Sequence, residues 1–282
     1  MQTKNRLLVV MAVLAFSFAF QPSKAQQVPS PSQSTMSAGS LTHEQGWAAY
    51  QRQNYKLAFD IFQRLARQGD TDAQVNLGFM YSIGEGVPKD YAAAASWSRR
   101  AAEKGHAKAQ GNLAYMYITG QGVAQDDAAA ASWYRRAAEQ GNALAQFNIG
   151  LMYFKGQGVQ QDYAAAASWY GRAAEQGDAK AQYNLGVMSG EGRGVPQDFV
   201  AAVNWYKKAA EQGDAGAQFN LGVMYFKGQG VQEDYVHAHK WLNLSAVGGN
   251  EENIRTRNLV AARMTPQQIA EAQRLAREWR RK

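Results

Sequence analysis

The chain has 282 residues, of which 46% are hydrophobic, 27 are glycine and only 6 are proline, and its formal net charge is +7. This composition is typical of a folded globular protein and excludes a disordered or collagen-like chain. Because the chain has no cysteine, a disulfide framework, a cysteine-ligated zinc site and a cysteine nucleophile are excluded as well.

The positive charge lies at the two ends of the chain. Residues 1–25 carry three basic residues and no acid, and residues 251–282 carry the remaining +4, so the long middle is neutral. A nucleic-acid-binding protein needs a basic face that neutralises phosphates. We therefore expect no nucleic-acid partner, and interpret the basic tail as the solvated end of a last helix. The tail contains Arg274, Arg277, Arg280, Arg281 and Lys282.

Residues 1–25 are predicted to be a signal peptide. Two basic residues precede the apolar run Leu7–Phe20, and Ser23 and Ala25 supply small residues at a cleavage site. The run has 14 residues, fewer than the roughly 20 that span a bilayer, which favours a cleaved signal over an uncleaved anchor. We expect a periplasmic or secreted protein with no stable membrane insertion after cleavage. Residues 26–40, rich in Gln, Ser and Pro, are expected to form a flexible leader.

Beyond the leader, the chain repeats itself every 36 residues. Such a period indicates a solenoid, in which each repeat packs on its neighbours. A solenoid is predicted over residues 41–250, beginning with a degenerate unit whose first helix starts near Trp47. The regular units start at Ala73, Ala109, Ala145, Ala181 and Ala217, and a tryptophan recurs at Trp97, Trp133, Trp169, Trp205 and Trp241.

Each unit is predicted to be a helical hairpin. In residues 126–140, apolar residues recur at i, i+3, i+4 and i+7, the stripe of an amphipathic helix. A first helix over residues 109–119 ends at Gly120, and Asp126 is placed to cap the second. The fold class is therefore all-α. A small residue inside each first helix is expected to allow close helix approach, at Gly78, Ala114, Gly150, Gly186 and Gly222.

The repeated phrase resembles the Sel-one-like (Sel1-like) repeat family, which is related to tetratricopeptide repeats. It reads Ala-Gln-x-x-Leu-Gly-x-x-Tyr-x-x-Gly-x-Gly-Val-x-x-Asp, followed by Ala-x-x-Trp-Tyr and Ala-Ala-Glu-Gln-Gly, and covers Ala73 to about Gly248. The resemblance implies a right-handed α-solenoid of about six antiparallel helix pairs that serves as a protein-interaction scaffold, often in exported bacterial proteins. Ser98, Asp127 and Ser189-Gly190 depart from the pattern, and the last pair is either a tolerated defect or a notch.

Residues 251–282 are predicted to form a C-terminal helical cap. A helix over residues 251–263 is followed by Thr265 and Pro266, which favour the start of a new helix. One face of that last helix would cover the open end of the stack. It contains Ile269, Ala272, Ala276 and Trp279.

We expect no catalytic site, no metal site and no cofactor. The glycine loops resemble a phosphate-binding turn, but that fingerprint requires a strand and a βαβ unit. His237 and His239 are two apart on a helix and point away from each other, which favours a solvent-exposed pair over a metal site. His43 and His106 lie elsewhere in the chain.

A binding surface is predicted on the first helices, which by analogy with tetratricopeptide arrays line the concave side. Asparagine amides can bind a peptide backbone, and methionine or aromatic side chains can accept varied apolar groups. The alternative is that the apolar residues pack between units and the asparagines bond to neighbouring turns. The candidates are Asn76, Asn112, Asn148, Asn184 and Asn220; Met80, Met116, Met152, Met188 and Met224; and Phe79, Tyr115, Phe147, Tyr183 and Phe219.

The sequence thus predicts an exported, non-enzymatic scaffold that binds a protein or peptide along its concave surface. Two alternatives remain open at this point: a hydrolytic envelope enzyme, and a structural envelope protein that associates with its own copies.

Overall fold

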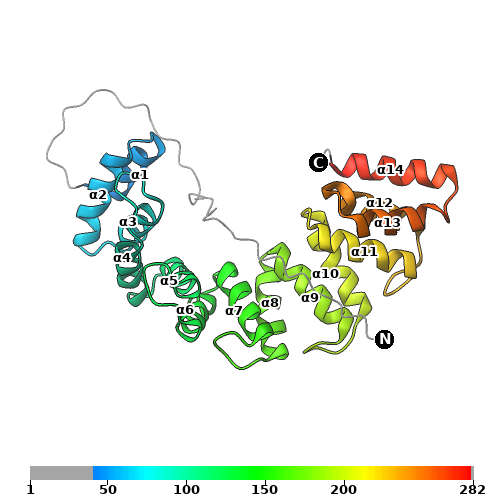
Figure 1. The fold of residues 1–282 in the computed structure, drawn as a ribbon, viewed down its shortest axis with the longest axis horizontal. Coiled ribbons are helices and arrows are strands. Elements are labelled where there is room, and N and C mark those ends of the chain that lie inside the picture. The colour runs from blue at the N-terminus through cyan, green and yellow to red at the C-terminus, as the bar shows by residue number, and fades with distance from the viewer. Residues whose placement is uncertain (1–40, 281–282) are drawn as a thin grey trace. The chain divides into compact units, whose positions relative to one another are not determined.

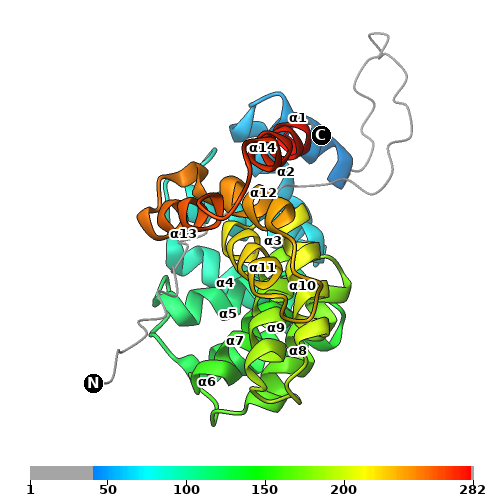
Figure 2. The same cartoon turned by 90° about the vertical axis from the view of Figure 1, so that its right-hand side faces the viewer.

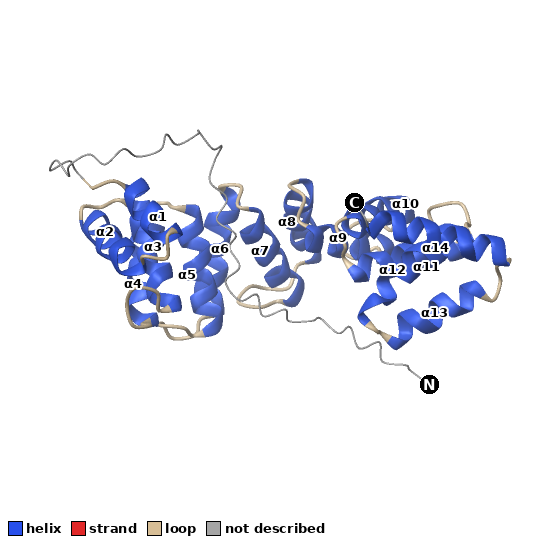
Figure 3. Ribbon diagram, turned by 90° about the horizontal axis from the view of Figure 1, so that it is seen from above, coloured by secondary structure: helices blue, strands red, loops and turns tan. Residues whose placement is uncertain are grey.

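The computed structural model describes residues 41–280, which form helices and loops without any strand (Figure 3). The predicted signal peptide and leader lie outside the described residues. The first helices of six pairs are α1 (His43–Gln51), α3 (Thr71–Ile83), α5 (Ala107–Thr119), α7 (Ala143–Lys155), α9 (Ala179–Glu191) and α11 (Ala215–Lys227). The second helices are α2 (Tyr55–Arg67), α4 (Tyr91–Glu103), α6 (Asp127–Glu139), α8 (Tyr163–Glu175), α10 (Phe199–Glu211) and α12 (Tyr235–Ser245). A 3-10 turn (Ala246–Gly248), α13 (Glu251–Ala261) and α14 (Pro266–Arg280) follow.

The helix pairs stack in chain order. From α3 to α11, every first helix has 13 residues, and each one after α3 starts 36 residues after the previous one. Within these pairs each helix packs mainly against the helices before and after it in the sequence (Figure 1). The predicted all-α solenoid of about six helix pairs is confirmed. The degenerate first unit begins earlier than Trp47, because Thr42 and Gln45 form a capping box that starts α1 at His43.

The predicted helix ends are confirmed by their caps. The Asp126 carboxylate accepts a hydrogen bond from the backbone N–H of Ala129 at 2.9 Å, and an aspartate caps the equivalent second helix in each regular unit. Gly120 ends α5 with a φ of 68°, a left-handed conformation that glycine adopts without steric cost. The hairpin geometry therefore follows from short local signals.

The small residues inside the first helices allow the two helices of a pair to approach closely, as predicted. A Cβ added to Gly150 would lie 2.9 Å from the Tyr170 ring, and one added to Gly186 would lie 2.7 Å from the Tyr206 ring. In the first regular unit, Gly78 faces Ser98, which replaces the tyrosine of the next three units. Close helix packing thus compensates for the low helix propensity of these glycines.

The second glycine of each loop joins one unit to the preceding one. This glycine lies so close to the first turn of the preceding second helix that an added Cβ would overlap a backbone carbonyl. No side-chain rotation can relieve such an overlap, so the loop glycine sets how the units dock. The glycine and carbonyl pairs are Gly86 and Tyr55, Gly122 and Tyr91, Gly158 and Asp127, Gly194 and Tyr163, and Gly230 and Phe199.

Buried glutamines form a second set of contacts between units. The Gln146 side-chain amide donates to the carbonyl of Ala138 in the preceding unit at 3.0 Å, and its oxygen accepts from Gln176 at 2.7 Å. Gln110 and Gln182 repeat both bonds. The glutamine belongs to an Ala-Gln pair that opens every regular unit of the sequence, but a polar residue in that pair does not by itself indicate a buried contact between units.

The C-terminal helices pack on the last repeat. The α14 helix lies against α12 (Figure 2). It buries Ala272 and Ala276, and the Trp279 ring meets the Trp241 ring at 6.2 Å, edge to face. The predicted capping face of α14 is therefore in contact with the stack. Within residues 41–280, no helix is both long and apolar enough to cross a membrane.

We predict that Gly158→Ala destabilises the protein more than Gly141→Ala does. Both glycines have a positive φ, 66° and 87°, where alanine costs about 1–2 kcal/mol. Only at Gly158 does the new methyl group overlap a backbone carbonyl, which we expect to add about 1–3 kcal/mol, whereas nothing lies within 4 Å at Gly141. Chemical denaturation midpoints measure the difference, and equal losses would contradict the docking role of the loop glycine.

We predict that Lys104→Gln stabilises the protein by about 1 kcal/mol. Lys104 occupies the position of Gln140, Gln176 and Gln212 but donates to the carbonyl of Gly69 instead, and the side-chain oxygen of Gln74 is buried without a partner. A glutamine amide at position 104 can supply the missing donor. The matched control is Gln140→Lys, which removes the donor to Gln110 and should destabilise. A lower denaturation midpoint for Lys104→Gln would contradict the prediction.

Candidate protein-binding surface

The five methionines predicted to line the binding surface are buried in the core. Their exposed fractions are between 1% and 6% for Met80, Met116, Met152, Met188 and Met224. Met152, for example, packs with Ile149 against Tyr134 of the preceding unit's α6. The expectation that these residues lie on an exposed face is wrong, because each first helix lies between two second helices and buries both of its sides.

The asparagines bond mainly across neighbouring helices. The Asn76 amide nitrogen lies 2.8 Å from the imidazole of His43, and Asn76 and Asn112 are both buried. Asn184 hydrogen-bonds the hydroxyl of Tyr170 in α8, and Asn220 bonds that of Tyr206 in α10. Burial raises the pKa of both tyrosines, so their hydroxyls stay protonated. For these asparagines the structure favours the alternative in which the amides hold adjacent units together.

The five predicted aromatic residues keep part of their surface exposed. Phe147 packs its ring 5.7 Å from Tyr170, and Tyr183 packs 6.0 Å from Tyr206. Half-buried Leu151 lies on the same helix as Phe147. We define the aromatic row as the part of the predicted surface that remains accessible. It consists of Phe79, Tyr115, Phe147, Tyr183 and Phe219, all half-buried.

A basic residue covers the repeated tryptophan of each second helix. The Arg136 guanidinium lies 4.7 Å from the centre of the Trp133 ring, within cation–π range. Because the two are three residues apart on one helix, they share a face. The same contact recurs at Arg100 on Trp97, Arg172 on Trp169 and Lys208 on Trp205. In the last unit the cation is the residue before the ring, Lys240 on Trp241.

The histidines do not converge on one site. His237 binds the Asp234 carboxylate at 2.7 Å and stacks on Tyr225. His239 is buried, and its pKa is lowered by burial and by Arg257, so the expectation of a solvent-exposed pair is wrong. Within residues 41–280, no three His, Asp or Glu side chains are grouped so that they could hold a metal ion.

The Ser189-Gly190 departure has a counterpart in the helix that faces it. In two earlier units an arginine of the second helix donates to a tyrosine hydroxyl of the next first helix, Arg99 to Tyr117 at 2.8 Å and Arg135 to Tyr153 at 2.7 Å. At the equivalent positions one unit later, glycine replaces the arginine at Gly171 and serine replaces the tyrosine at Ser189. We call this place the α8–α9 seam; it lacks a bond that holds the preceding units together.

We predict that Gly171→Arg and Ser189→Tyr together stabilise the protein by about 1 kcal/mol more than the sum of the single changes. A Cβ on Gly171 would meet nothing within 4 Å, so a side chain can begin there without overlap. Gly171→Arg alone should stabilise by up to about 1 kcal/mol through helix propensity. The measurement is a double-mutant cycle, in which denaturation midpoints are compared for the original protein, the two single variants and the double variant. A second cycle with Arg135→Gly and Tyr153→Ser, at a place where the bond exists, is the matched control. The prediction would be contradicted if the stability changes of the two seam variants were strictly additive while those of Arg135→Gly and Tyr153→Ser were coupled.

Comparisons with known proteins agree with this architecture. The Sel1 repeat matches residues 37–70, 71–106, 107–142, 143–178, 179–214 and 215–250. No curated protein matches the chain.

Two crystal structures are similar to it. One is of a protective antigen present in uropathogenic Escherichia coli strains that displays an SLR fold, with 38% identity, a TM-score of 0.76 and 83% of this chain covered. The match spans 52% of that antigen, about half its length. The other is a Sel1 repeat protein from Oxalobacter formigenes, with 36% identity, a TM-score of 0.72, and 76% of this chain and 88% of that chain covered. The chain therefore belongs to the Sel1 repeat (SLR) family and has six repeats.

Proposed function

We propose that the chain is an exported, non-enzymatic scaffold that binds a protein or peptide partner along the aromatic row of its first helices. The observation that carries the proposal is a line of half-buried aromatic side chains, one in each first helix from α3 to α11. Aromatic residues that are partly desolvated before binding are the common anchors of protein interfaces.

The pattern of variation along the repeats supports this surface. The buried glutamine and methionine are the same in all five regular units, because every unit meets the same packing demand. The aromatic row instead shifts by one helical turn along the array: Phe79 and Tyr115 share one repeat position, and Phe147, Tyr183 and Phe219 share the position four residues earlier. At each of the two positions, the other units carry valine, leucine or glycine. A surface that differs from unit to unit can recognise a partner whose side chains also differ along its length.

Export is supported by the predicted signal peptide, and the chain is similar to a protective antigen of uropathogenic Escherichia coli strains. The chain spans only about half of that antigen, so the antigen's own role is not assigned to this protein. The periplasm and the extracellular space both fit the proposal.

We predict that Phe147→Ala weakens partner binding at least about tenfold, because it removes a central anchor of the row. The experiment is quantitative affinity capture from an envelope extract of the organism that produces the protein, with the purified full chain as bait. The matched control is Val200→Ala, which truncates an apolar side chain that is 58% exposed on the second helix α10. Thermal midpoints of both variants separate lost binding from lost folding.

Each outcome of the capture distinguishes the proposal from its alternatives. A stoichiometric heterologous partner that is kept by Val200→Ala and lost by folded Phe147→Ala supports the scaffold. Association with copies of the same chain alone would support a structural envelope protein. Hydrolysis of envelope material by the purified chain would support an enzyme and refute the proposal.

A further inference from the structure

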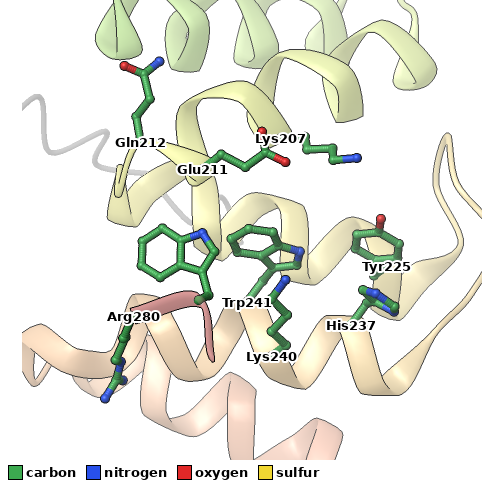
Figure 4. Close-up of a pocket in the computed structure, with 9 residues that line it drawn as sticks. Lys207, Glu211, Gln212, Tyr225, His237, Lys240, Trp241 and Arg280 are labelled. Atoms are coloured by element: carbon green, nitrogen blue, oxygen red, sulfur yellow. The ribbon is translucent and has the colours of Figure 1, made fainter. Parts of the chain in front are cut away.

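A cleft of about 720 Å³ lies at the C-terminal end of the solenoid, between α10, α11, α12 and α14. This volume is within the usual range for ligand sites. Figure 4 shows Lys207 and Glu211 projecting from one side of the cleft and Lys240, Trp241 and His237 from the opposite side. Tyr225, Gln212, Trp279 and Arg280 complete the lining.

The cleft exists because the last unit departs from the earlier ones. Lys207 and Tyr225 occupy the positions at which Arg99 bonds Tyr117 and Arg135 bonds Tyr153. Among the described residues Lys207 makes no such bond, and the Tyr225 ring stacks on His237 at 5.4 Å instead. The cap then adds Trp279 and Arg280, which no other unit possesses.

The lining carries an excess of positive charge. Lys207, Lys240 and Arg280 face a single carboxylate in the lining, that of Glu211. The nearby carboxylate of Asp234 already binds the imidazole of His237 at 2.7 Å. A partly enclosed site with more cations than carboxylates attracts an anionic ligand.

The aromatic side chains of the lining favour a ligand that has an apolar group as well as negative charge. The Lys240 ammonium lies 4.2 Å from the centre of the buried Trp241 ring, which holds the cation in place. Trp279 and Tyr225 are only half-buried and present exposed ring surface. A ligand that uses the whole lining therefore carries an aromatic or large apolar group beside its negative charges.

We propose that this cleft binds an acidic peptide segment of a partner protein, in which carboxylates flank an aromatic side chain. The inference rests on the proposed function and adds a second contact site to it, distinct from the aromatic row. The ring surfaces of Trp279 and Tyr225 would gain no contact from a dense polyanion without apolar groups. A peptide supplies carboxylates, an apolar group and backbone amides together.

The test uses a fluorescein-labelled peptide of sequence Glu-Asp-Phe-Glu-Glu-Trp-Asp and an analogue with glutamine and asparagine at the acidic positions. Fluorescence anisotropy with the full chain should show that the acidic peptide binds at least about tenfold more tightly, and that added salt weakens it. Equal binding of the two peptides, or no binding of either, would overturn the proposal.

Two lysine variants locate the binding. Lys240→Gln should weaken the acidic peptide at least about tenfold, whereas Lys208→Gln should leave it unchanged. Lys208 is the matched control, because its ammonium also lies 4.2 Å from a tryptophan ring, that of Trp205, but outside the cleft. Trp279→Ala, with a thermal midpoint that shows the cap still folds, should also weaken the peptide. Equal effects of the two lysine variants would overturn the assignment.

Two further outcomes separate this inference from the proposed function. Inorganic polyphosphate that displaces the peptide at a lower concentration than unlabelled peptide would identify a general polyanion site and overturn the proposal. A captured partner that is lost by Phe147→Ala but kept at full affinity by Lys240→Gln would overturn the cleft inference and leave the scaffold function standing.

Discussion

The close approach of a loop glycine to the helix of the preceding unit governs the rest of this structure. At Gly158 and its equivalents, the backbone of one loop lies against the carbonyl at the start of the preceding second helix, with no room for a Cβ. That contact joins backbone to backbone, so it does not vary with the side chains around it. The buried glutamine bonds and the arginine-to-tyrosine bonds are added to a geometry that the glycine has already determined.

The local parts of the fold could be predicted because their signals lie within a few residues of one another. Asp126 caps its helix three residues away, and Gly120 ends a helix at its own position. The burial of Met152 could not be predicted in the same way, since it depends on α6 of the preceding unit. The sequence pattern indicates one apolar stripe for each first helix, but these helices bury two faces. The second face includes the glutamine positions and, in two units, asparagine positions, which are polar in the sequence. Of the candidate site, the aromatic row remains accessible, whereas the methionines do not.

The features that distinguish this chain from a uniform array occur in pairs across helix contacts. Gly171 and Ser189 occupy the positions at which two earlier units place arginine and tyrosine, and Lys207 stands near Tyr225 without bonding it. Each change is small in the sequence, but the first removes a bond between units and the second leaves a cleft. The repeated units form the common scaffold, and these paired substitutions change the contacts at particular places along it. The departure at Ser189 is visible in the sequence alone, but its structural effect becomes clear only together with Gly171 on α8, the other member of the pair.

The glycine contact also limits how the length of such a protein can change. A segment that is shorter or longer than one unit would move the loop away from the helix on which it must dock. A complete segment of 36 residues restores the same junction on both of its sides. The array can therefore grow or shrink by duplication or loss of whole units, with the terminal helices retained. Evolution can therefore change the length of the array and the number of aromatic side chains that it presents. No new type of interface between units is required.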